Sequence, residues 1–288
     1  MNSELSRDAV LGRIGELPAL PAVVGDILGA LENEVEPTER LVGRINADPV
    51  LVARVLGAAN SASQGSRQRI GSLLEAITLL GFNRVRQLVL MTALVRQFQP
   101  ASAVFDPTTF WRHSFAVAVC AAVIAREAAM DEELAFNAGL LHDIGHLFIV
   151  IAYPREFEAI LARMLAHDTD IVVAERAILG LDHSQIGSAM AEHWSLPGAF
   201  VEAIEGHHNP DGRNNDAFSN VVHVAEILSY ALDIGTIPRS AVPAFSSRAQ
   251  AHLGLSWQDV AGRFGEIEAK YRAACLEFGF SPPRLSPP

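Results

Sequence analysis

The stretch GLLHDIGHLFIV, residues 139–150, sets His142, Asp143 and His146 within an apolar run. Apolar residues recur at steps of three and four here and in almost every other segment, whereas the alternation typical of strands is hard to find. The sequence therefore predicts an all-α protein. Two histidines one helical turn apart, with a carboxylate directly behind the first, also raise the question of a metal site.

Composition narrows the class of protein. The chain has 288 residues, 50% of them hydrophobic, and a formal net charge of −11. Nucleic acid and anionic membranes would repel such a surface, so we expect direct binding to neither. Two cysteines offer no disulfide framework, and the only lysine, Lys270, excludes a phosphate-binding loop that ends in Gly-Lys-Ser/Thr. The N-terminus lacks a signal-peptide pattern and apolar runs such as FAVAVCAAVIA (115–125) fall short of a bilayer span, so we expect a cytoplasmic protein.

Several helix starts are marked by capping residues. Asp48 and Asp106 each precede a proline, which fits the first helical position because its missing N–H costs no hydrogen bond there. Asp182 and Gln185 have the spacing of a capping box. We therefore expect helices to begin directly after these aspartates.

Proline-rich and turn-rich stretches indicate the domain boundaries. We expect an N-terminal helical subdomain at residues 1–105 and a second helical subdomain at 106–240 that holds nearly all the histidines. Residues 241–288 should form a C-terminal helix, which begins near SWQD (256–259), and a disordered tail. One apolar stripe of that helix should pack onto the body of the protein: Val260, Phe264, Ile267, Tyr271, Cys275 and Phe278.

Two metal-site interpretations compete for the HDIGH segment. In the first, His142 and His146 at i and i+4 bind one zinc ion, as in H-E-x-x-H proteases, although Asp143 is shorter than Glu and Gly145 weakens the helix. In the second, His142 and Asp143 are the ligands and other helices supply the rest. The candidates for those further ligands are, in chain order, His113, His183, His207, His208 and Glu226.

A structural interpretation stands beside both. A histidine in a helix is more often hydrogen-bonded within the fold or exposed than bound to a metal. We prefer that interpretation for the histidines outside the candidate set: His146, His167, His193, His223 and His252. For the candidate set, spacing alone leaves the structural and the metal-binding interpretations both open.

Longer motifs carry a resemblance to a known family. In the first half these are LPALPAVVGDIL (17–28), INADPVLVARVLGAANSAS (45–63) and SLLEAITLLGFNRVRQLVL (72–90). In the second half they are FNAGLLHDIGHLFIV (136–150), DHSQIGSAMAEHWSLP (182–197) and AIEGHHNP (203–210). Together they resemble the HDOD family, the HD-related output domain, over roughly residues 16–235. The resemblance implies an N-terminal helical bundle packed on an HD-type bundle, acting in bacterial signal transduction.

The resemblance also implies a ligand set and a function. The related HD-GYP phosphodiesterases of cyclic di-GMP hold two or three metal ions, and their ligand order matches His113, His142, Asp143, His183, His207 and His208, with Glu226 where those enzymes have Asp. However, His146 replaces their lysine, and their Gly-Tyr-Pro is absent after HHNPDG. We therefore expect a regulatory module that binds a signalling protein or a nucleotide in the cleft between the bundles, with divalent metal (Fe, Mn, Zn or Mg) retained. The alternative is a metal-dependent phosphohydrolase in which Asp143 bridges two ions.

A locally basic stretch lies between residues 61 and 100, where Glu75 is the only acid. Its arginines are Arg67, Arg69, Arg84, Arg86 and Arg96. Arg84 and Arg86 are candidates for binding an anion or an acidic partner, since guanidinium groups suit phosphate and carboxylate. Being two residues apart, they cannot share one helix face, and a solvated helix surface is the alternative interpretation.

Overall fold

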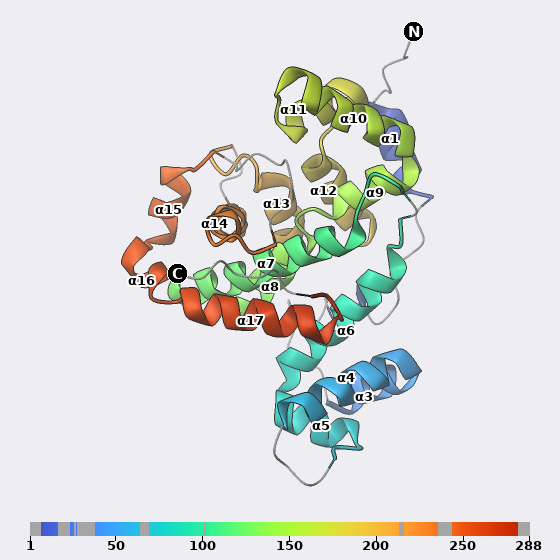
Figure 1. The fold of residues 1–288 in the computed structure, drawn as a ribbon, viewed down its shortest axis with the longest axis vertical. Coiled ribbons are helices and arrows are strands. Elements are labelled where there is room, and N and C mark those ends of the chain that lie inside the picture. Colours follow the sequence, from blue (N-terminus) through green and yellow to red (C-terminus); the bar gives the residue numbers. More distant parts are fainter. Residues whose placement is uncertain are drawn as a thin grey trace. The chain divides into compact units, whose positions relative to one another are not determined.

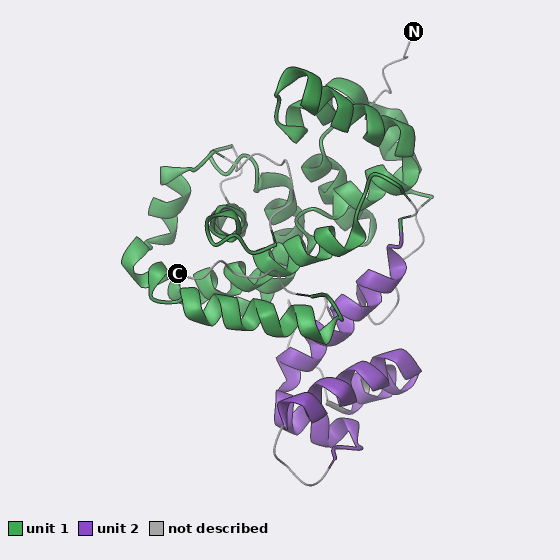
Figure 2. Ribbon diagram, viewed as in Figure 1, with its two compact units in different colours: residues 1–18, 100–288 green, residues 19–99 purple. Residues whose placement is uncertain are grey.

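The computed structural model describes residues 7–16, 24–25, 27, 38–63, 69–100, 102–212, 216–235 and 244–281 (Figure 1). Every regular element in these ranges is an α-helix, which confirms the predicted fold class. The chain divides into two compact units (Figure 2). The smaller comprises residues 19–99, and the larger comprises residues 1–18 with 100–288.

The described part of the smaller unit contains α3 (Thr38–Asn46), α4 (Pro49–Ala62), α5 (Leu73–Leu80) and α6 (Phe82–Gln97). As expected, Asp48 caps α4 by accepting a hydrogen bond from the main-chain N of Val50 at 2.8 Å. Apolar faces of all four helices, together with Ile27, form one core: Ile27, Leu41, Ile45, Leu51, Val55, Ala59, Leu73, Ala76, Ile77, Val85 and Val89.

The larger unit surrounds the histidine-bearing segments with helices. Its central pair, α7 (Pro107–Glu127) and α8 (Glu132–Leu141), packs against α14 (Ala217–Ala231), which Figure 1 shows end-on. Next to them, α9 (Ile144–Ala152) contacts α12 (His183–His193), and α12 contacts α13 (Gly198–Gly206). The outer helices are α1 (Arg7–Ile14), α10 (Pro154–His167), α11 (Ile171–Leu179), α15 (Ser247–Leu253), α16 (Trp257–Ala261) and α17 (Phe264–Glu277).

Helix α1 belongs to the larger unit although the sequence-based division placed it in the N-terminal subdomain. It contacts α12, and the main-chain carbonyl of Ala9 accepts a hydrogen bond from the Tyr153 hydroxyl at 3.3 Å. Arg13 lies over the ring of Tyr153, 4.8 Å from its centroid. Tertiary contacts therefore attach this first helix to a part of the chain far away in sequence.

The described part of the C-terminal region forms three helices, α15, α16 and α17, where the sequence predicted one. Ser256 caps α16 as expected, but the helix stops at Gly262 and α17 begins at Phe264. Most of the predicted apolar stripe is buried: Val260, Ile267, Tyr271, Cys275 and Phe278. The stripe packs onto the body of the unit, since α17 contacts α7. Of the predicted disordered tail, SPPRLSPP (281–288), residues 282–288 lie outside the described residues.

Among the described residues, two segments have the length and apolar composition of a membrane span, contrary to our expectation that the apolar runs are too short. They are Pro107–Glu127 and Glu132–Ala152. However, within each segment an 18-residue apolar stretch is mostly buried inside the protein, 83% in the first and 89% in the second. That burial is typical of core helices, and the two segments form α7, α8 and α9 of the larger unit.

Candidate metal centre

The HDIGH segment is not one continuous helix. Helix α8 ends at Leu141 and α9 begins at Ile144, so His142 and Asp143 lie at the junction between them. The first interpretation, with His142 and His146 at i and i+4 of one helix, is therefore wrong in its geometry. The junction lets two adjacent side chains enter the interior from the ends of two helices.

Gly145 lets α9 lie close against α12 because it lacks a side chain. A Cβ at this position would lie 2.0 Å from the main-chain oxygen of His183 and 2.9 Å from the main-chain N of Gly187. Glycine thus permits α9 to approach α12 at the point where His183 begins that helix. The sequence pattern marked Gly145 as a weak point of a helix, and in the structure the same glycine allows α9 and α12 to come together.

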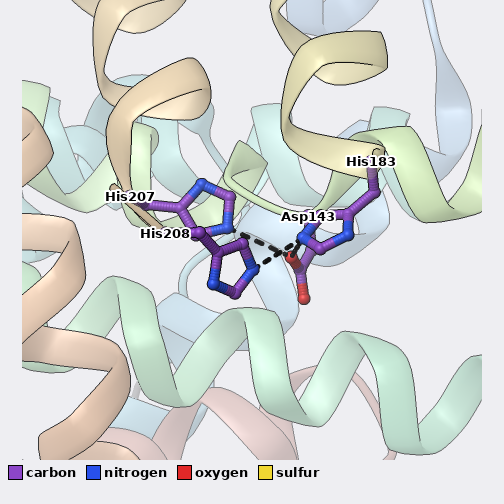
Figure 3. Close-up of side chains that lie close together, drawn as sticks. All are labelled: Asp143, His183, His207 and His208. Atoms are coloured by element: carbon purple, nitrogen blue, oxygen red, sulfur yellow. Dashed lines mark hydrogen bonds and ion pairs between the residues drawn. The ribbon is translucent and has the colours of Figure 1, made fainter. Parts of the chain in front are cut away.

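Asp143 lies at the centre of the cluster. Its Oδ2 is 3.3 Å from Nε2 of His142 and 3.7 Å from Nε2 of His113. Its Oδ1 is 3.3 Å from Nε2 of His183 and 3.7 Å from Nε2 of His207. Figure 3 shows the Oδ1 side, with His208 beside the other rings and its Nε2 2.8 Å from Nε2 of His183. Except for the half-buried His208, these side chains are buried.

Three of the imidazoles are oriented by main-chain carbonyls. Nδ1 of His113 lies 3.0 Å from the oxygen of Gly235, Nδ1 of His142 lies 2.7 Å from that of Gly139, and Nδ1 of His207 lies 2.7 Å from that of Ile204. Because a carbonyl only accepts, each Nδ1 is the protonated nitrogen and each Nε2 carries the lone pair in the neutral ring. This anchoring is how proteins orient histidine ligands of metals.

The Nε2 atoms of the same three rings are buried, and none has a hydrogen-bond partner among the described residues. Oε2 of Glu226, which approaches from α14, is also buried without one. Buried polar atoms are normally hydrogen-bonded, so a set of lone pairs around one carboxylate needs another partner. A divalent cation fits this donor set.

The seven ligand candidates fall into two groups whose donor atoms lie within 4.8 Å of one another. The first comprises Asp143, His183, His207 and His208, and the second comprises His113, His142 and Glu226. The two oxygens of Asp143 face different groups. The structure thus brings together every predicted ligand in a buried His/Asp cluster capable of metal binding.

Burial and charge set the protonation states. Burial lowers the pKa values of His113 and His207 to about 4, so both rings are neutral near pH 7 and ready to bind a cation. Burial alone would raise the pKa of Asp143, but neighbouring histidines, His142 foremost, outweigh it and hold the pKa well below the usual value. Burial raises the pKa of Glu226 to about 8.

Glu175 and His146 also contact the cluster, although neither was predicted from the sequence to take part in it. Glu175 of α11 is fully buried and contacts both His183 and His146. Burial lowers the pKa of His183, but the Glu175 carboxylate outweighs it and raises the pKa to about 10. The available signal was the one acid in the largely apolar helix IVVAERAIL, four residues before the buried Leu179 and hence on the same face.

His223, interpreted as structural, has a supporting contact: its Nδ1 lies 2.8 Å from the main-chain oxygen of His207. The proposed arginine site is less favoured. Arg86 is buried and donates a hydrogen bond to the main-chain oxygen of Ile27 at 2.8 Å, which gives it a role in the core of the smaller unit. Arg84 is half-buried, and Arg67 lies outside the described residues.

The all-helical fold and the buried cluster at a His-Asp helix junction define an HD-type protein. A model of the HDOD domain family matches residues 17–210, and the chain therefore belongs to the HDOD family. An HDOD domain protein of unknown function from Geobacter sulfurreducens has a similar structure, with 25% identity, a TM-score of 0.79, and 95% of this chain and 99% of that chain covered. A candidate phosphohydrolase from Shewanella amazonensis SB2B gives 27% identity and a TM-score of 0.76, with 93% and 97% covered.

Curated relatives match over part of their length. An uncharacterized protein of Treponema pallidum (strain Nichols) is 25% identical over 267 residues, which cover 89% of this chain and 51% of that protein. Ribonuclease Y of Thermus thermophilus is 32% identical over 120 residues, 42% of this chain and 16% of the ribonuclease. The chain thus spans about half the length of the first relative and a small part of the second.

Proposed function

We propose that this chain is a metal-loaded HDOD signalling module, which holds divalent ions in its buried cluster and acts by binding a signalling protein or a nucleotide. The observation that supports metal binding is the set of buried Nε2 atoms of His113, His142 and His207. Each belongs to a ring anchored through Nδ1, and each lacks a hydrogen-bond partner among the described residues. Such preoriented lone pairs would be costly in the fold unless a cation satisfies them.

Two ions fit the cluster better than one. His183, His207 and His208 would hold the first with Oδ1 of Asp143, while His113, His142 and Glu226 would hold the second with Oδ2. An imidazole-rich set of this kind suits Fe, Mn or Zn more than Mg, which prefers oxygen ligands. When bound, the ions would supply positive charge that offsets the buried carboxylates.

The residue after HDIG supports a module over an enzyme. In hydrolytic relatives this position carries a lysine for the substrate phosphate, according to the family resemblance, but here it is His146. That ring is buried, stacks on His183 with centroids 3.8 Å apart, and contacts Glu175. A side chain held in this way is turned toward the metal cluster and provides no cationic contact for a phosphoester.

Hydrolysis of a phosphoester is the second candidate function. The observation that favours it is the division of the Asp143 carboxylate, whose two oxygens face separate histidine sets. A carboxylate shared between two ions is a recurrent feature of two-metal phosphoester hydrolases. The similar protein of Shewanella amazonensis SB2B is described as a candidate phosphohydrolase.

Metal analysis followed by turnover assays tests the proposal. Protein purified without chelator should contain Fe, Mn or Zn, and His142→Ala and Asp143→Ala should lose it, whereas the exposed His167→Ala should not. Cyclic dinucleotides, simple phosphodiesters and RNA are then offered with Mn²⁺ or Fe²⁺. Bound metal without turnover supports the module. Turnover that Asp143→Ala abolishes would establish the hydrolase, and absence of metal from the wild type would contradict both.

A further inference from the structure

The side chain of Glu175 joins two histidines behind the metal cluster. It is 0% exposed, and its Oε2 accepts hydrogen bonds from the main-chain N of His183 at 2.9 Å and from Nδ1 of the same residue at 2.7 Å. Its Oε1 lies 3.1 Å from Nδ1 of His146. Oε1 is buried and makes no hydrogen bond to a described residue, but the negative charge of the carboxylate beside Nδ1 of His146 favours a proton on that nitrogen.

The opposite nitrogens of both rings face the central carboxylate. Nε2 of His183 is 3.3 Å and Nε2 of His146 is 3.9 Å from the same atom, Oδ1 of Asp143. The rings are nearly parallel, with 22° between their planes. One buried carboxylate therefore contacts the Nδ1 side of two imidazoles at once.

We infer that Glu175 is a positioning residue of the metal cluster, which keeps Nδ1 of both His183 and His146 protonated and thereby turns two Nε2 lone pairs to the ion on the Oδ1 side of Asp143. This inference rests on the proposed metal-binding function and extends it to a residue that contacts no ion itself. It also makes His146 a member of the site: in place of a substrate-binding cation, the position after HDIG supplies a further imidazole.

Substitution by glutamine isolates this role because it keeps the shape of the side chain. Glu175 offers two acceptor oxygens to three N–H groups, whereas an amide offers one oxygen and one NH₂ donor. If the amide oxygen accepts the hydrogen bonds of His183, the NH₂ group faces Nδ1 of His146. That ring must then move its proton to Nε2, where the N–H points at Asp143 and competes with the cation.

The test is to titrate the metal-free protein with Co²⁺. The dissociation constant and the visible absorption spectrum of the bound ion are both measured. We expect Glu175→Gln to weaken Co²⁺ binding by about 10–100-fold and to change the absorption spectrum. The exposed Glu158→Gln, which removes the same charge from α10, should change neither. A Gln variant with wild-type affinity and spectrum, and only a lower melting temperature, would show that Glu175 merely stabilises the fold.

If Glu175→Gln alone fails to fold, a second pair of variants tests the inference: His146→Phe, and His146→Phe combined with Glu175→Gln. His146→Phe keeps a ring beside His183 but removes the Nδ1 donor, so the further change Glu175→Gln should cost little in Co²⁺ affinity. A large additional loss in this background would contradict the inference. Failure of the wild type to bind Co²⁺ would instead contradict the proposed metal-binding function and, with it, this inference, whereas an unaffected Gln variant contradicts the inference alone.

Discussion

Glu226 shows how a single residue depends on the state of the cluster. Its carboxyl group is buried, Oε2 has no hydrogen-bond partner in the described part of the chain, and burial raises its pKa to about 8. Without a cation the group is therefore mostly protonated at pH 7. Metal binding would require that proton to leave, so ion uptake and proton release are coupled at this position.

We predict that Glu226→Gln changes the pH dependence of stability in the metal-free protein. Between the unfolded pKa of 4.5 and the folded pKa of about 8, the folded protein holds one proton more on this group. Stability conferred by the protonated group is therefore present at low pH and is lost as pH rises through this window. Glutamine cannot titrate, so urea unfolding at pH 5, 6, 7 and 8 should show a smaller decline than in the wild type. If the free energy of unfolding declined equally with pH in both proteins, the raised pKa would belong to a group other than Glu226.

At the scale of the elements, the approach of α9 to α12 determines whether the histidines meet. The contact runs through Gly145, where a Cβ would fall 2.0 Å from the main-chain oxygen of His183. A main-chain atom cannot rotate away as a side chain can, so any larger residue must push the helices apart. The helix start that carries His183 would move with them.

Gly145→Ala should therefore destabilise the protein by roughly 1–3 kcal/mol, the usual cost of overpacking, and should also weaken metal binding. Urea unfolding and metal content measure the two effects. Gly43→Ala is the control, because a Cβ at Gly43 of α3 meets no atom within 4 Å. If Gly145→Ala retained full stability and full metal content, the close approach of α9 and α12 would be disproved.

Helix α17 is joined to α7 by a bidentate ion pair as well as by its apolar stripe. Nη1 and Nη2 of Arg126 donate to the two carboxylate oxygens of Glu266 at 2.9 and 2.7 Å. These hydrogen bonds, with a further one from Lys270, lower the pKa of Glu266 to about 2. Both partners are about one-third exposed (32% and 30%), so solvent screens the pair.

Glu266→Gln should lower the free energy of unfolding by about 1 kcal/mol or less at pH 7. Because the pKa of Glu266 is depressed, its contribution is complete above the unfolded pKa of 4.5 and is lost as pH falls toward about 2. The difference between the wild type and the variant should accordingly shrink in acid. Chemical denaturation at pH 7 and pH 3 measures it, and a difference that grows in acid would refute the assignment.

For the whole molecule, metal binding at the cluster would be linked to the stability of the larger unit. The ligand candidates come from α7, the α8–α9 junction, α12, the end of α13, and α14. These segments lie far apart in the sequence and meet in the folded state. A cation that binds them there and not in the unfolded chain must stabilise the fold.

We predict that saturating Mn²⁺ or Zn²⁺ raises the melting temperature of metal-free protein. At an ion concentration of 100 times the dissociation constant, the gain should be about 2.7 kcal/mol. Scanning calorimetry with and without metal measures it, and Asp143→Ala should show no gain. Equal stabilisation of the wild type and Asp143→Ala would mean that the ion binds elsewhere.

The sequence by itself determined the helical class, several helix starts and the set of ligand candidates. Apolar periodicity and capping act within a few residues, so Asp48, Asp106 and Asp182 cap helices in the structure as expected. The ligand set came from motifs that resemble the HDOD family, since spacing alone left a structural role open for the same histidines.

Only the tertiary structure decided how these residues are used. The helix break at His142 and Asp143, the contact of Glu175 with His183 and the burial of Arg86 depend on which distant segments approach one another. Local patterns report which face of a helix is apolar, but not which polar side chain on that face meets a partner. The hydrogen-bond partner of a buried group such as Glu175 is supplied by a neighbouring helix, and the arrangement of the helices is set by the packing of the whole unit.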